Sequence, residues 1–290
     1  MDIGGQVIHA INGWLQSLAM GVLQPALDSV SLLLFQTPAL DAIPEVQQTT
    51  GTIRGVSNSL FVLAILACGA LIMGSGTFET QYTAKRLLPR LVLGAVLSNA
   101  SLVVCANLTK LDNGLILALL GPDPAKNTWS QLTTGLTTGN LSGLIIFVFI
   151  ALVAAVMTVL LIVIYVARDL VLLVLTVAAP LMLATYSVPQ TEEIARLWWR
   201  GYSAALFIQV AHALLIGVGA QLVAHSGWLG TPGSALINGL MLVALLYLMV
   251  KVPLVAYRWV FRHPVSQSPV VKTVVVAAKT VGKVAALAAA

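Results

Sequence analysis

Charged residues are scarce in this 290-residue chain: Asp, Glu, Lys and Arg make up 9% of it, whereas 59% of the residues are hydrophobic. An ordinary soluble domain is about 25% charged. With so few charges, a soluble fold of this size could not cover its surface. The scarcity therefore excludes a water-soluble class and indicates that lipid solvates much of the chain.

Motifs for metal, nucleotide and redox chemistry are also missing. The two cysteines, Cys68 and Cys105, lie in apolar runs without a CxxC or Cys/His cluster, which favours packing residues over a zinc site, an iron–sulfur cluster or a disulfide. HExxH and GxxxxGK(S/T) are absent, which excludes metalloprotease and ATPase classes. Ser75 and His212 give only weak support for an intramembrane serine protease. We expect no enzyme activity, no catalytic or metal residues and no cofactor.

The sequence instead contains several long apolar runs. A helix needs about 20 apolar residues to cross the hydrocarbon of a bilayer. Runs near that length occupy residues 56–74, 91–108, 141–167, 170–186, 201–224 and 235–257. Residues 7–36 are also apolar but contain Gln16, Gln24, Pro25 and Asp28, and their apolar residues recur at helical spacing. That pattern predicts an amphipathic helix lying in the membrane interface.

Basic residues predict the orientation of the chain. They gather in residues 77–90 and after Tyr257, and both segments should be cytoplasmic because Lys and Arg mark cytoplasmic loops. The net charge of +5 therefore indicates topology, and no direct nucleic-acid-binding motif is present. We predict an extracytoplasmic-side amphipathic region at 1–54, a transmembrane helical domain at 55–257 and a basic cytoplasmic tail at 258–290.

The run at residues 170–186 contains Pro180 and decides the number of spans. If this run crosses fully, six spans place the basic tail outside, against the distribution of Lys and Arg. If it turns back at the proline, five spans place the tail inside. We therefore predict an all-α polytopic helical bundle of about five transmembrane helices plus a re-entrant or half-length helix, with six full spans as the alternative.

Several polar residues inside these runs are candidate assembly or lumen-facing residues. A polar stripe at three- and four-residue spacing crosses the second run, and it either lines an aqueous lumen or bonds neighbouring helices. Its members are Ser98, Ser101, Cys105, Thr109 and Asp112, with Asn99 beside it.

Later runs carry further candidates. Arg168 and Asp169 either make a contact inside a multi-subunit assembly or snorkel to the interface as a helix-end pair. Gln209 and His212 are one helical turn apart, which favours interhelical hydrogen bonds over a proton relay. Trp198, Trp199 and Arg200 suit an aromatic anchor beside a cytoplasmic arginine.

Two segments resemble the TrbL-like family of type IV secretion and conjugative transfer proteins. They read AKRLLPRLVLGAVLSNASLVVCANLTKLDNGL and RDLVLLVLTVAAPLMLATYSVPQTEEIARLWWRGYSAALFIQVAHALL. The first shows the basic Arg-Leu-Pro-Arg-like entry to an Asn/Ser-bearing span, and the second shows the alanine–proline break and the Trp/Arg segment of that family. The resemblance covers about residues 50–260. The positions that carry the pattern are Arg90, Asn99, Arg168, Pro180, Trp199, Arg200 and Gln209.

The resemblance implies a multi-pass subunit of the inner (cytoplasmic) membrane. The distribution of Lys and Arg predicts an N-terminus outside and a C-terminus in the cytoplasm. The resemblance also implies a homo-oligomer that forms part of a platform or channel for DNA or protein transfer, beside ATPases and pilus or channel components. The alternative function is a secondary transporter or permease, which would favour paired broken helices in two repeats.

Overall fold

All regular secondary structure that we describe is helical. The computed structural model describes residues 33–74, 78–124, 144–187, 191–224 and 235–262, together with residues 13, 14, 17, 21, 25 and 29. Its long helices are α2 (Pro44–Gly74), α3 (Phe78–Leu120), α5 (Leu144–Ala184), α6 (Glu192–Ala224) and α7 (Ala235–Arg262). Two short 3-10 helices, η1 (Leu40–Ala42) and η3 (Thr185–Ser187), precede α2 and follow α5. The predicted all-α class is confirmed.

Four helical stretches in the described residues are long and apolar enough to cross a membrane. They are Pro89–Leu120, Phe149–Ser187, Glu192–Leu222 and Gly239–Arg258. Together they confirm a polytopic membrane protein. The span predicted at residues 56–74 lies in α2, where several side chains are outside the described residues, and it stays a prediction.

Other sequence-based predictions also fall outside the described residues. They concern most of the interfacial helix predicted at residues 7–36, the residue Ser75 and the tail beyond residue 262. The predicted region boundaries at residues 54/55 and 257/258 fall inside α2 and α7. The assignment of these regions to membrane sides stays a prediction.

The helices present one face to the protein and another to lipid, because side chains repeat every 3.6 residues. On α5 the buried residues follow three- and four-residue spacing: Leu161, Tyr165, Arg168, Leu172, Thr176 and Ala179. Between them Val163, Leu170 and Val174 are each about 60% exposed. Such exposed aliphatic residues are what a lipid-facing surface needs.

The chain divides into two compact units. The first comprises Met1–Pro38, Thr109–Leu170 and Ala205–Ala256. Its apolar core joins α3, α5, α6 and α7 through residues such as Ile116, Leu161, Ile216 and Leu246, all of them fully buried. Small residues, among them Ala154 and Ala213, allow these helices to approach closely.

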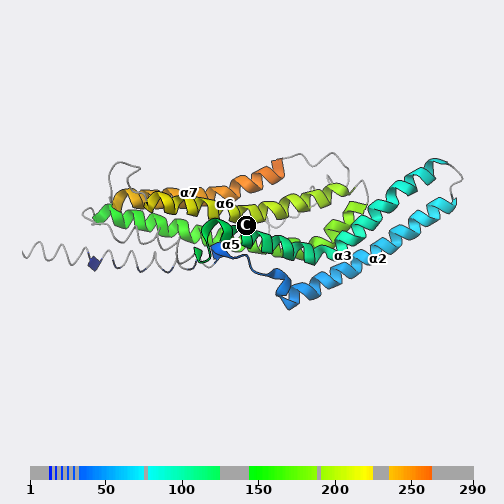
Figure 1. Cartoon of the computed structure of the whole chain (residues 1–290), viewed down its shortest axis with the longest axis horizontal. Coiled ribbons are helices and arrows are strands. Elements are labelled where there is room, and N and C mark those ends of the chain that lie inside the picture. The colour runs from blue at the N-terminus through cyan, green and yellow to red at the C-terminus, as the bar shows by residue number, and fades with distance from the viewer. Residues whose placement is uncertain are drawn as a thin grey trace, which may run out of the picture. The chain divides into compact units, whose positions relative to one another are not determined.

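The second unit comprises Ala39–Leu108, Val171–Ala204 and Tyr257–Ala290. Here α2 and the first part of α3 run side by side in opposite directions (Figure 1). The amides of Asn58 and Asn99 exchange two hydrogen bonds of 3.2 and 3.0 Å between these helices. Gly94 on α3 packs directly against Ser187 of η3, and a Cβ atom at this position would overlap the Ser187 hydroxyl.

The predicted turn at Pro180 is wrong. The helix α5 continues from Leu144 through Arg168, Asp169 and Pro180 to Ala184, and α6 begins only at Glu192. Residues 141–167 and 170–186 therefore belong largely to one helix rather than to a span and a separate element. Arg168 is neutralised by carboxylates inside the protein, so its charge does not have to lie at a membrane interface. Pro180 removes only one backbone N–H, and α5 continues to Ala184 past it.

Candidate functional site

A buried arginine is the centre of the candidate site in the first unit. Arg168 is only 1% exposed. Its Nε donates to the carbonyl of Ala205 at 2.7 Å, and its Nη1 donates to Asp169 Oδ1 at 3.0 Å. Its Nη2 lies 3.4 Å from Oδ2 of Asp112, which is 2% exposed. A buried charge persists only when it is paired and hydrogen-bonded, and Arg168 meets both conditions.

Thr37 joins this ionic cluster from the segment before η1. Its Oγ1 accepts a 3.0 Å hydrogen bond from Arg168 Nη2. The same hydroxyl contacts two acceptors, Asp112 Oδ2 at 3.1 Å and Gln209 Oε1. Since a hydroxyl has one proton, it donates to only one of them at a time. Thr37 thus couples the ion pair to Gln209.

Side chains also hold the backbone around Thr37. The Asn113 amide accepts from Thr37 N at 2.9 Å and donates to Thr37 O at 3.1 Å. Gln209 Nε2 donates to Leu34 O at 3.1 Å. A residue that precedes proline is disfavoured in a helix, so the helical residues 33–35 end before Thr37 and leave backbone groups without helical partners. α3 and α6 supply those partners.

His212 in α6 donates the hydrogen bond that a backbone carbonyl of α7 lacks because of a proline. Pro253 lies inside α7 and has no N–H, so the carbonyl of Met249, four residues earlier, lacks its helical donor. His212 Nε2 lies 2.8 Å from that carbonyl, and Nδ1 lies 2.6 Å from the Tyr165 hydroxyl. Because a carbonyl only accepts, Nε2 carries a proton, and in the neutral ring Nδ1 accepts from Tyr165. The Tyr165 ring in turn lies 6.0 Å from the Arg168 guanidinium carbon.

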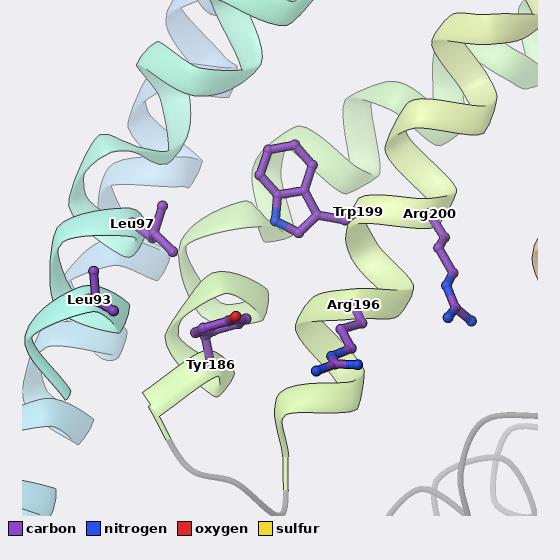
Figure 2. A pocket seen from close by; sticks show the side chains of 6 residues that line it. All are labelled: Leu93, Leu97, Tyr186, Arg196, Trp199 and Arg200. Atoms are coloured by element: carbon purple, nitrogen blue, oxygen red, sulfur yellow. The ribbon is translucent and has the colours of Figure 1, made fainter. Parts of the chain in front are cut away.

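The second unit holds the other basic candidates. Arg90 on α3 forms a 3.0 Å ion pair with Glu192, which also binds Arg196 at 2.6 Å. Near this network is a pocket of about 580 Å³. Figure 2 shows its lining, which α3, η3 and α6 provide: Leu93, Leu97, Tyr186, Arg196, Trp199 and Arg200.

The two neighbouring tryptophans have different environments. Trp198 is 2% exposed, donates to Leu175 O at 2.8 Å and stacks on Tyr202 with ring centroids 5.1 Å apart. Trp199 is 36% exposed and lines the pocket. Only Trp199 therefore has the exposure that an interfacial anchor requires.

The polar stripe predicted on α3 is buried along its whole length, from Ser98 through Ser101, Cys105 and Thr109 to Asp112. Asn99 beside it is exposed and bonds Asn58. The structure brings five predicted residues to the ionic cluster and its histidine: Asp112, Arg168, Asp169, Gln209 and His212. It places Arg90, Ser98, Asn99, Ser101, Pro180, Trp199 and Arg200 in the second unit instead.

Thr37, Asn113 and Tyr165 are contributors that the sequence-based selection missed. A signal existed for Tyr165, which lies one helical turn before Arg168 and therefore on the same face of α5. A weaker signal existed for Thr37, which precedes a proline. Nothing in the sequence pairs either residue with its partner. In the residues that the structure describes, no group of three or more His, Cys, Asp or Glu could hold a metal ion.

Comparison with known proteins identifies the family. The model of the TrbL/VirB6 plasmid conjugal transfer like protein family matches residues 2–290, which is nearly the whole chain. No curated protein and no solved structure matches. The chain therefore belongs to the TrbL/VirB6 plasmid conjugal transfer like family, and this membership implies a component of a conjugal transfer or type IV secretion system.

Proposed function

We propose that several copies of this chain form part of the inner-membrane platform or channel of a conjugal transfer machine. The chain acts by assembly and not as an enzyme. Its partners are further copies of itself, the energising ATPases and the pilus or channel components. Family membership supports the general role, and the surface of α3 supports the multimer.

The position of Lys110 on α3 is the observation that most directly supports a multimer. It is exposed, and in the described residues no carboxylate pairs with it. It lies inside the apolar stretch Pro89–Leu120, ten residues before its end, which is about 15 Å along the axis at 1.5 Å per residue. A lysine that faces lipid inside such an apolar stretch is costly. A neighbouring subunit or a water-filled lumen would supply the polar surroundings that Lys110 requires.

Buried hydroxyls in the second unit support a hydrated interior. Thr50, Ser57, Ser98 and Ser101 are all 0% exposed, and no hydrogen-bond partner for their hydroxyls is found among the described residues. By contrast, the exposed hydroxyl of Thr49 on α2 donates a hydrogen bond to the carbonyl of Glu45, four residues earlier. Buried polar groups are normally hydrogen-bonded, often to water. Ordered water enclosed between α2 and α3 would supply partners for these four hydroxyls.

The inner membrane and the orientation are part of the same proposal. The basic segment at residues 77–90 and the tail after Tyr257 favour the cytoplasmic side, and residues 1–54 favour the outside. The alternative function, a secondary transporter, would favour discontinuous helices. Pro180 and Pro253 instead lie within helices that continue past them, so we do not propose that alternative.

Cysteine crosslinking tests the multimer. The two native cysteines are replaced by alanine, and the variant must still support conjugal transfer in a strain that lacks the wild-type gene. Lys110→Cys is then oxidised in membranes, and we expect a disulfide-linked dimer. Phe149→Cys is the matched control, because Phe149 is 65% exposed on α5. Equal crosslinking at both positions, or none at Lys110→Cys, would contradict the proposal.

A further inference from the structure

We propose that the pocket of the second unit binds the phosphate headgroup of an anionic phospholipid, with part of an acyl chain against its leucine wall. The proposal rests on the six lining residues, on the charges around them and on their place in the helices. It assigns to this surface a ligand that the role in conjugal transfer does not require.

The pocket has one apolar wall and one basic wall. In Figure 2, Leu93 and Leu97 lie on α3, Tyr186 lies in η3, and Arg196, Trp199 and Arg200 lie on α6, from which Trp199 extends toward α3. Its volume of about 580 Å³ falls in the range of roughly 300–1,000 Å³ that is typical of small-molecule sites. A phospholipid has the same two-part chemistry, an anionic head and an apolar chain.

The basic wall has unused hydrogen-bond donors. Glu192 binds both Arg90 and Arg196, so one carboxylate faces two guanidinium groups. No carboxylate pairs with Arg200 anywhere in the described residues. Arginine donates two parallel hydrogen bonds to a phosphate, and bonds between charged partners are stronger than neutral ones. Arg200, together with the exposed Arg196, can therefore donate hydrogen bonds to the singly charged phosphodiester of a phospholipid.

The pocket lies where three membrane-spanning stretches begin or end. Tyr186 is next to the end of the stretch Phe149–Ser187, and Arg196 and Arg200 follow the start of Glu192–Leu222 within nine residues. Leu93 and Leu97 follow the start of Pro89–Leu120 in the same way. Basic pockets between helices at the cytoplasmic boundary are typical headgroup sites, and tryptophan and tyrosine are enriched at that depth. A free phosphate would leave the leucine wall without a role.

Native mass spectrometry of the full-length chain in mild detergent tests the site. The chain is titrated with phosphatidylglycerol, phosphatidylcholine or inorganic phosphate. We expect phosphatidylglycerol to form a saturable one-to-one adduct, and phosphatidylcholine and inorganic phosphate to bind at least about tenfold more weakly. Equal binding of the two lipids would overturn the proposal, and so would inorganic phosphate that competes as well as the anionic lipid does.

Variants locate the adduct. Arg196→Gln with Arg200→Gln should weaken phosphatidylglycerol binding by about tenfold or more, because charged hydrogen bonds are lost. Leu93→Ser with Leu97→Ser should weaken it while sparing selectivity for the anionic head. Arg258→Gln is the control, since Arg258 is an exposed arginine on α7 outside the pocket. If Arg258→Gln weakens binding as much as the pocket variants, the binding is unspecific and the site is wrong. If a pocket variant fails to fold, the comparison of the two lipids on the unmodified chain still tests the proposal.

Discussion

The role of Arg168 in the structure differs from both roles that the sequence suggests. Beside Asp169 in the chain it suits a pair at a helix end. In the structure its main partners come from elsewhere: Asp112, 56 residues away, and Thr37, 131 residues away. These partners keep the guanidinium inside the bundle, where it joins four segments of the first unit. Two interactions of single residues can be tested by substitution.

The first concerns the ion pair of Arg168 with Asp112. Arg168→Met leaves the Asp112 carboxylate buried without its cation, and removing one partner of a buried pair typically costs about 3–5 kcal/mol. Arg168→Met combined with Asp112→Leu removes both charges and should recover part of that loss. Thermal melting of the purified chain in detergent measures both, with Lys251→Met as an exposed control. A double variant that melts below the single one would argue against the pairing.

The second concerns the histidine and proline of α6 and α7. His212→Leu leaves the Met249 carbonyl without a donor, and Pro253→Ala restores an N–H that can reach it. We therefore expect Pro253→Ala to stabilise the His212→Leu variant more than it affects the wild type. The coupling should be on the order of one hydrogen bond, about 1 kcal/mol. Equal effects of Pro253→Ala in both backgrounds would show that His212 does not replace the backbone donor that Pro253 lacks.

At the scale of the element, the approach of η3 to α3 depends on one glycine. A Cβ on Gly94 would overlap Ser187 Oγ and lie 3.2 Å from Ser187 N. In Gly94→Ala the Ser187 hydroxyl can rotate away, but the Cβ and N of Ser187 at 3.2 Å still require η3 to shift by a few tenths of an ångström, and we expect a lower melting temperature.

Gly114 provides the matched control for Gly94 on the same helix. No atom lies within 4 Å of the Cβ that an alanine would place there. Gly114→Ala should stabilise the chain slightly, by about 0.5–1 kcal/mol, because alanine is the better helix former. If the two alanine variants melt alike, η3 does not pack on α3 as described.

Helix periodicity explains what could be predicted about the elements. The stripe from Ser98 to Asp112 follows from 3.6-residue spacing alone, and all its members are buried. The continuity of α5 could not be predicted, because it depends on neutralising Arg168 with a carboxylate of another helix. Trp198 and Trp199 are adjacent in sequence, and only packing against Tyr202 decides which of them is buried. Local patterns thus identify faces, while partners across helices require the fold.

At the scale of the whole molecule, the few charges should fix the orientation. A cysteine placed at Ala290 should not react with a membrane-impermeant thiol reagent in intact cells, and should react once the cells are opened. The reason is the excess of Lys and Arg after Tyr257. Labelling in intact cells would place the C-terminus outside and reverse the proposed orientation.

The exposed lysine of α3 and the family membership lead to one claim: the chain works as a multimer in the membrane. The most direct measurement is the protein mass of the complex extracted in mild detergent, by light scattering with the detergent contribution subtracted. We expect a whole-number multiple, greater than one, of the 30.5 kDa chain mass. A single species of 30.5 kDa that still restores conjugal transfer on return to membranes would contradict the account.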